Sequence, residues 1–426
     1  MITVVNRNPD SFHADDAAAR AVIAPAVIDG ADPPAAARWW SRWPWWVQVL
    51  AVYAGARLVS AGIFLAVAGT QEANLWTPAA PSYADYTGGM WDADWYRQIA
   101  EGGYPESLPR GADGGVQQNA WAFFPLFPAL ARAVMQVTGG SWNLVAPTLA
   151  LLLGGVAMLV VHRLVAAVAP GRGLPLVTVL LLSTFASAPV LQTAYTESAA
   201  LALLAAVLWC LVRRRYLLGV PLVLVLGCTR AVALPVVVAV SAHGFSRWRE
   251  ARDCGRPFTD GLRIAVLGAA AGVAGLLWPA LVGVLTGEPD AYAQTQAAWR
   301  GRGAVVPVLP WFDVARWLFG PLGTVIVVAL FALAVAAVVR LRRLGPELQG
   351  WTGGYLAYLL VVVEPGSSLV RFLLLAVGLA AGLGAWALRS RWWPALLSAL
   401  VVFGIAGQVA WIGLLWRLVP PSGWPP

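Results

Sequence analysis

Long apolar stretches recur along this chain, and they constrain its fold more than any other feature. They include residues 149–161, 262–285, 325–339, 372–388 and 395–415. About 20 apolar helical residues cross the roughly 30 Å hydrocarbon layer of a bilayer. Charged residues make up only 12% of the chain, whereas soluble domains carry about 25%. The sequence therefore predicts an all-α polytopic membrane protein.

The apolar stretches predict a bundle of about eleven transmembrane helices. The predicted spans are 45–69, 142–162, 174–190, 196–212, 216–227, 231–245, 262–286, 321–340, 349–363, 369–388 and 393–415. Segments 216–227 and 231–245 are too short to cross singly, so we interpret them as a re-entrant-like pair with a polar turn at 228–230.

The chain outside the spans divides into a tail and one large loop. Residues 1–37 are rich in Ala, Asp and Pro and predict a disordered cytoplasmic tail. Their pattern is not that of a removable signal peptide. Residues 38–420 form the predicted membrane domain, in which 70–141 is a large first outer loop. Its many aromatic residues favour the membrane–water boundary, with short interfacial helices near 99–100 and 126–137.

Arginine clusters orient the predicted bundle. The chain has 29 basic residues, all of them arginine. Most lie between alternate spans, at 38–42, 163–172, 213–215, 247–263, 340–343 and 389–391. By the positive-inside rule these loops are cytoplasmic. The opposite face then receives most of the carboxylates, and a nucleic-acid partner is not expected because the arginines do not gather on a soluble face.

The densest constellation of chemically able side chains lies in the first loop. Asp92 and Asp94 stand two residues apart between Trp91, Trp95 and Tyr96. A carboxylate there could act as general base beside an acceptor hydroxyl, and the aromatic rings could stack on a sugar. The alternative interpretation is a solvated acidic turn with aromatic anchors.

Polar residues further along are weaker candidates. Gln118 and Asn119 precede an aromatic and proline-rich segment and could bind sugar hydroxyls, although a membrane-docking segment is the simpler interpretation. Glu197 begins a span, where it could cap the helix or line the site. Arg57 lies within the first span and needs a partner that the sequence does not name.

Two arginines lie at outer ends of spans. Arg230 sits in the turn of the short pair, and Arg371 follows Glu364 by a few residues. A guanidinium binds phosphate in a bidentate manner, which suits a lipid-phosphate donor. The alternatives are snorkelling and, for Arg371, a local ion pair with Glu364.

Neither a metal centre nor a nucleotide fingerprint is evident. Cys210, Cys228 and Cys254 lack metal-type spacing, and neither a Walker loop nor a GxGxxG motif occurs. We therefore expect no dedicated cofactor, although an Asp92/Asp94 pair could bind a divalent cation.

Several of these residues resemble a known family. The chain contains Trp91-Asp92-x-x-Trp95-Tyr96-x-x-Ile99-Ala100-x-x-Gly103-Tyr104, then Ala122-Phe123-Phe124-Pro125-Leu126-x-Pro128. These motifs resemble the first outer loop of the PIG-V-like mannosyltransferases of the GT-C class. Tyr195-Thr196-Glu197-Ser198, Gly227-Cys228-Thr229-Arg230 and Ser368-Leu369-Val370-Arg371-Phe372 look like later landmarks of that family.

The resemblance implies an inverting glycosyltransferase that moves mannose from a lipid-phosphate carrier on the non-cytoplasmic side, with Asp92 as base. Its expected partners are the lipid-linked sugar donor, a glycolipid or glycan acceptor, and membrane lipids. A Gly- and Asp-rich insertion between Tyr104 and Gln117 departs from the pattern. The lysine-free, alanine-rich composition favours a bacterial plasma membrane and a polyprenyl carrier.

Three alternatives stay open at this point. The first is a GT-C transferase that uses another lipid-linked sugar, such as arabinose. The second is a transporter or flippase of lipid-linked sugars, for which broken helices in both halves of the chain are typical. The third is a non-catalytic scaffold subunit of an envelope assembly.

Overall fold

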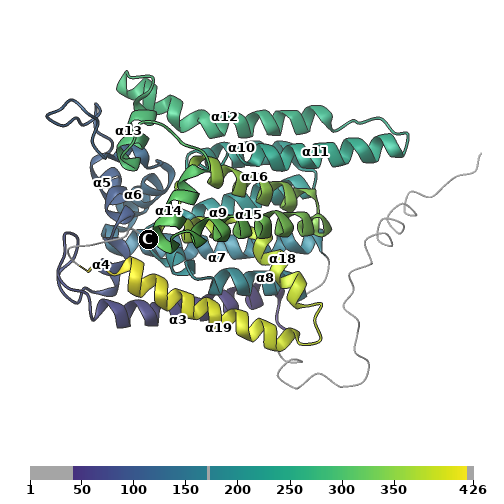
Figure 1. Ribbon diagram of the computed structural model, residues 1–426, viewed down its shortest axis with the longest axis horizontal. Helices are drawn as coiled ribbons and strands as arrows, with labels where there is room; N and C mark the ends of the chain where they lie inside the picture. The colour runs from purple at the N-terminus through teal and green to yellow at the C-terminus, as the bar shows by residue number, and fades with distance from the viewer. Residues whose placement is uncertain (1–41, 170–172, 420–426) are drawn as a thin grey trace, which may run out of the picture.

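The computed structural model describes residues 42–169 and 173–419, whose long helices lie side by side along one common direction (Figure 1). The predicted tail 1–37 lies outside the described residues. The α-helices are α3 (Trp45–Ala68), α4 (Tyr83–Gly88), α5 (Asp92–Gly102), α6 (Leu126–Thr138), α7 (Trp142–Val168), α8 (Gly173–Thr184), α9 (Glu197–Val212), α10 (Tyr216–Gly227), α11 (Val236–Asp253), α12 (Gly261–Thr286), α13 (Ala291–Arg300), α14 (Leu309–Phe319), α15 (Leu322–Arg340), α16 (Pro346–Val362), α17 (Leu369–Phe372), α18 (Val377–Ala387) and α19 (Trp393–Trp411). The short 3₁₀ elements are η3 (Ala120–Ala122), η4 (Ala188–Gln192), η5 (Leu341–Leu344) and η6 (Leu373–Leu375), and η7 (Ile412–Trp416) is a π-helical turn.

Within the described residues, five helices are long and apolar enough to cross a membrane, or six if a bent pair counts as one span. The five are α3, α7, α12, α15 with η5, and α19 with η7. Each remaining predicted span also contains a helix, but α8, α9 and α10 have only 12, 16 and 12 residues. The predicted helices are thus found, whereas the predicted count of about eleven crossings is not confirmed by length and composition.

The two ends of the bundle differ in structure: short helices gather at one end, and arginine-rich loops lie at the other. At one end, on the left of Figure 1, α4, α5, α6 and α13 gather. At the other end the start of α3 meets the end of α7, where Trp45 stacks on His162 with 5.1 Å between ring centroids. His243 and Glu347 also meet at this second end, 2.6 Å apart. The loops with clustered arginines join helices at this second end.

The first loop is folded against the bundle. Pro125 precedes α6 and Pro128 lies in its first turn, where proline is tolerated because the first backbone N–H groups have no intrahelical partner. The indole of Trp278 on α12 donates to the carbonyl of Trp121 over 3.1 Å. Arg110, in the insertion, pairs with Glu288 at 2.6 Å. Helices α5 and α6 occur where short helices are predicted near 99–100 and 126–137, and their place at the membrane interface stays a prediction.

Arg57 obtains its partners from a break in the chain after α8. The predicted span 174–190 ends as an α-helix at Thr184, and η4 follows. The Arg57 guanidinium donates to the carbonyl of Ser183 over 2.6 Å and also to that of Ala188. Carbonyls at a helix end have no intrahelical donor. The buried arginine therefore supplies hydrogen-bond donors to carbonyls that the break in the helix leaves without them.

A second break shapes the last third of the chain. The predicted span 369–388 is not one helix, because α17 with η6 and α18 meet at a 74° bend. Carbonyls freed by the bend receive donors from α16: Trp351 Nε1 bonds Leu375 O at 2.9 Å, and the Tyr355 hydroxyl bonds Phe372 O at 3.0 Å. The bend therefore holds Arg371 in a short, buried turn.

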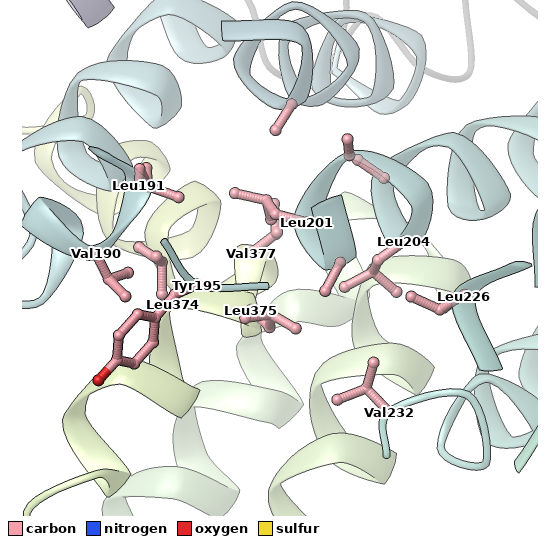
Figure 2. Close-up of a cluster of buried hydrophobic side chains, with 14 of the residues drawn as sticks. Val190, Leu191, Tyr195, Leu201, Leu204, Leu226, Val232, Leu374, Leu375 and Val377 are labelled. Carbon is pink, nitrogen blue, oxygen red and sulfur yellow. The ribbon is translucent and has the colours of Figure 1, made fainter. Parts of the chain in front are cut away.

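Buried apolar side chains fill the space between these two breaks. Figure 2 shows Val190, Leu191 and Tyr195 near Leu374 and Leu375, with residues of α9, α10 and α18 alongside. All five side chains are almost fully buried. Close packing of this kind resists small displacements, so it fixes the segments before Glu197 and after Arg371 relative to each other.

Candidate active site

Asp92 is the first residue of α5, and the backbone that leads into it is unusual. Trp91, which precedes it, has a φ of 58°, a region that a side chain rarely occupies without support. Its indole Nε1 donates to the carbonyl of Trp416 over 2.8 Å, and its ring lies 4.9 Å from that of Trp76. These contacts aim α5 so that the Asp92 carboxylate lies at the helix N-terminus, where the helix dipole favours negative charge.

Four charged side chains from distant parts of the chain form one network. Arg371 Nη2 contacts Asp92 Oδ2 at 2.7 Å, and Arg371 Nη1 contacts Glu197 Oε1 at 3.3 Å. Arg230 Nη1 contacts the same Glu197 oxygen at 2.6 Å. The order is therefore Asp92, Arg371, Glu197, Arg230, with alternating charge. We call this the charge network.

Neutral groups complete the surroundings of the two arginines. Arg230 donates to the Thr196 hydroxyl at 3.1 Å, and Arg371 donates to the Ser368 hydroxyl at 3.4 Å. Both guanidiniums lie over the ring of Phe372, at 4.9 and 5.2 Å from its centroid. Each arginine is thus restrained by charge, by a hydroxyl and by an aromatic face.

The four members of the charge network differ in exposure. The Glu197 side chain is 0% exposed and that of Arg371 7%, whereas Arg230 and Asp92 reach 14% and 18%. Two acids and two arginines leave no formal net charge. Burial without partners would be costly for each ion. Because acids and arginines alternate in the network, each charge has an oppositely charged partner.

Two neutral phenols border the carboxylates. Burial raises the pKa of Tyr195 and of Tyr96, so both stay protonated at neutral pH. The Asp92 backbone N–H donates to the Tyr195 hydroxyl over 3.2 Å. The Tyr96 hydroxyl lies 3.5 Å from that of Thr196. The site therefore contains hydroxyl donors next to its acids.

Comparison with solved structures gives distant likenesses, of which one is an oligosaccharyltransferase. The chain is similar to an oligosaccharyltransferase structure from Archaeoglobus fulgidus, tethered with an acceptor peptide, with a TM-score of 0.44 and 13% identity. The match covers 89% of this chain and 56% of that chain. No family model matches the sequence. No curated protein matches it either.

An aromatic wall continues from Asp92 along α5. Trp95 stacks on Phe123 with ring centroids 5.8 Å apart, and Tyr96 packs edge-on against Phe123 at 5.2 Å. Trp299 of α13 meets Trp95 at 5.5 Å. Sequence patterns indicate Trp91, Trp95 and Tyr96 and include Phe372 in a motif without giving it a role, but they miss Trp299, which stands in no motif.

Three predicted site residues have other contacts. Asp94 accepts from Gln98 at 2.9 Å and from Arg97, both on its own helix. Asn119 is buried; it accepts from the Trp121 backbone and donates to Thr295 at 3.2 Å. Gln118 is exposed. Substrate contact by these residues stays a prediction, and none of them contacts the charge network through the hydrogen bonds described.

The alternative prediction of a local ion pair between Arg371 and Glu364 is wrong. Glu364 pairs with Arg302 at 2.5 Å, while Arg371 turns to Asp92 and Glu197. The choice between capping and lining for Glu197 is also clarified, because its Oε1 contacts both arginines from the first turn of α9. Its Oε2 is buried and has no hydrogen-bond partner among the described residues.

The carboxylates do not converge on a common point as metal ligands do. Among the described residues, no group of three or more His, Cys, Asp or Glu side chains is placed to hold a metal ion. Asp92 contacts Arg371 and Asp94 contacts Arg97, so the two acids face different partners. A divalent cation at an Asp92/Asp94 pair stays a prediction.

Proposed function

We propose that this protein is an integral-membrane glycosyltransferase of GT-C type that moves mannose from a polyprenyl-phosphate-mannose donor to a lipid or glycan acceptor on the non-cytoplasmic face. One observation carries the proposal: a partly exposed carboxylate, Asp92, lies 2.7 Å from Arg371 in a network that also contains Arg230. A carboxylate and two guanidiniums therefore stand together at the loop-rich end of an apolar bundle, and we assign them the roles of base and phosphate-binding groups. The resemblance of the motifs around Asp92 to PIG-V-like mannosyltransferases supports the choice of a lipid-phosphate donor and of mannose as the sugar.

In the proposed reaction Asp92 takes the proton of an acceptor hydroxyl. The resulting oxygen attacks the anomeric carbon of mannose while the bond from that carbon to the phosphate oxygen breaks. The lipid phosphate leaves with the bonding electron pair. A single in-line displacement inverts the anomeric centre, and positioned proton transfer contributes typically 10²–10⁴-fold to such a rate.

The arginines act on the leaving group. Negative charge grows on the bridging phosphate oxygen as the bond breaks, and in this proposal Arg230 and Arg371, which meet at Glu197, stabilise it. Guanidiniums match the geometry of phosphate oxygens and stay charged at all relevant pH values. Fixed donors of this kind stabilise the transition state without reorganising during the reaction.

The test is reconstitution of the purified protein in proteoliposomes with radiolabelled polyprenyl-phosphate-mannose and a membrane lipid extract. We expect label to move to a lipid or glycan species, with release of polyprenyl phosphate. A parallel reaction with polyprenyl-phosphate-arabinose tests the sugar. Label that crosses the bilayer while still attached to its carrier identifies a flippase, and unchanged donor on both sides contradicts the proposal.

A further inference from the structure

Glu197 is a shared acceptor between two arginines. Its Oε1 lies 2.6 Å from Arg230 Nη1 and 3.3 Å from Arg371 Nη1, so the two guanidiniums approach a single atom. Glu197 is fully buried, whereas Asp92 is partly exposed. A substrate approaching from outside therefore meets Asp92 and the arginines, with Glu197 behind them.

Phe372 supports the same two arginines from another side. Its ring centroid is 4.9 Å from the Arg230 guanidinium carbon and 5.2 Å from that of Arg371. Its own backbone carbonyl accepts a bond from the Tyr355 hydroxyl at 3.0 Å, which fixes the residue at the bend. An aromatic face attracts a guanidinium without using its N–H donors, so the N–H groups stay directed to oxygens.

We propose that Glu197 and Phe372 are positioning residues that hold Arg230 and Arg371 as one clamp for the phosphate of the lipid-linked donor. We call the two arginines the guanidinium clamp. Like charges this close repel each other, and each long arginine side chain has many rotamers to lose. A shared carboxylate and a shared ring offset both effects. This inference rests on the proposed function, because it assigns the clamp to the donor of that reaction.

The clamp also indicates which contact the phosphate replaces. The charge network has no formal net charge, so an added anion gains a favourable contact with an arginine by displacing a carboxylate from it. Glu197 is buried and bonded by both guanidiniums, whereas Asp92 contacts only Arg371 within the network and is the more exposed acid. The phosphate therefore takes the place of Asp92 on Arg371, and Asp92 becomes available to the acceptor hydroxyl only after the donor has bound.

The experiment measures binding of a fluorescent polyprenyl monophosphate to the purified full-length protein in detergent. Polyprenyl alcohol serves as the ligand without phosphate. Glu197→Asp keeps the charge but shortens the side chain, so one carboxylate no longer reaches both arginines. Phe372→Leu removes the ring but keeps an apolar side chain, and Phe372→Tyr restores a ring. Glu347→Asp is the matched control, because Glu347 is another buried acid, bonded to His243 at 2.6 Å at the opposite end.

We expect wild-type protein to prefer the phosphate over the alcohol. Glu197→Asp and Phe372→Leu should each weaken phosphate binding by about tenfold or more, since small misplacements of binding groups are costly. Phe372→Tyr and Glu347→Asp should bind as wild type does. In transfer assays the two impaired variants should raise the KM for donor and leave the KM for acceptor unchanged.

Three results would overturn the inference. They are wild-type affinity in both Glu197→Asp and Phe372→Leu, an equal loss in Glu347→Asp, and the absence of any phosphate preference in wild-type protein. If Glu197→Asp does not fold, the two Phe372 variants still decide the outcome. Phosphate binding that follows the expected order without sugar transfer would refute the proposed function and leave the clamp in place.

Discussion

At the scale of single residues, the candidate site is held together by ion pairs between a few buried charged side chains. Asp92 contacts Arg371, and Glu197 contacts Arg371 and Arg230. Arg230 could be selected from the sequence because a charge within a membrane span is costly and tends to be retained for use, and Asp92 because it stands among aromatic residues in the first loop. Their pairing could not be selected, because ion-pair partners depend on distances that local sequence does not contain.

Replacement of Asp92 by asparagine tests the proposed base. Asp92→Asn keeps the size of the side chain but removes the proton acceptor, so we expect transfer to fall by about 10²–10⁴-fold. The assay is label transfer in proteoliposomes, with folding checked by size-exclusion chromatography. Glu101→Gln, at an exposed position near the other end of α5, is the control. Turnover close to that of wild type in Asp92→Asn would remove Asp92 from this role.

Metal dependence can be tested at the same scale. Two guanidiniums supply positive charge at the proposed leaving group, which is one of the tasks of a divalent ion in other transferases. We therefore expect transfer to persist unchanged after treatment with EDTA. Loss of activity that Mg²⁺ or Mn²⁺ restores would show instead that the carboxylates bind a metal ion.

At the scale of elements, close backbone approaches and helix breaks place the site residues. α10 and α12 touch where Gly227 meets Ala274, and Arg230 follows Gly227 in the chain. The break after α8 and the 74° bend before α18 bring Glu197 and Arg371 into the same region. Sequence patterns predict helices at all of these segments but not the breaks, which hydrogen bonds from other helices stabilise.

Gly227→Ala tests the contact between α10 and α12. A Cβ at this position would clash with the carbonyl oxygen of Ala274, so one backbone must move. Overpacking of this kind costs about 1–3 kcal/mol, and the shift should displace Arg230 and lower transfer. Thermal unfolding and donor KM measure the two effects. Gly272→Ala is the control, since a Cβ there would have no neighbouring atom within 4 Å; equal behaviour of both variants would contradict the argument.

Arg57→Met tests the break after α8. Without the guanidinium, the carbonyls of Ser183 and Ala188 lose buried donors. An unsatisfied buried group costs about 1–3 kcal/mol, so we expect a lower Tm in detergent and an unchanged donor KM. Arg263→Met, at an exposed position on α12, should unfold as wild type does. A wild-type Tm for Arg57→Met would mean that the two carbonyls find other donors.

At the scale of the whole molecule, the two ends of the bundle separate basic loops from the candidate site. The turn between α11 and α12, with arginines at positions 247–263, lies at one end, while α5, α6 and α13 lie at the other (Figure 1). A positive-inside bias then places the site on the non-cytoplasmic face. This orientation follows from charge alone and stays a prediction.

Thiol labelling tests the orientation. Cys254 is exposed at the arginine-rich end, and Cys210 is buried. Ser107 is exposed in the first loop. In a Cys228→Ser background, a membrane-impermeant maleimide should label Ser107→Cys but not Cys254 in intact cells, and the pattern should reverse in inverted vesicles. Labelling of Cys254 in intact cells would invert the proposed topology.

The sequence by itself determined the helices and the kinds of side chain available for chemistry. Apolar runs are local, so residues 142–162 and 262–286 could be recognised as helices without knowledge of their neighbours. The acidic and aromatic residues around Asp92 likewise indicated a site, because composition reports which reactions a segment can support.

Only the tertiary structure decided which of these residues act together. By sequence, Glu364 was the local partner expected for Arg371, yet Glu364 contacts Arg302 and Asp92 contacts Arg371. Packing around two helix breaks settles this choice, because ion pairs form only within a few ångströms and chain separation says nothing of such distances. Phe372 entered the site for the same reason: its ring has no chemistry of its own, and its role comes from lying under two arginines.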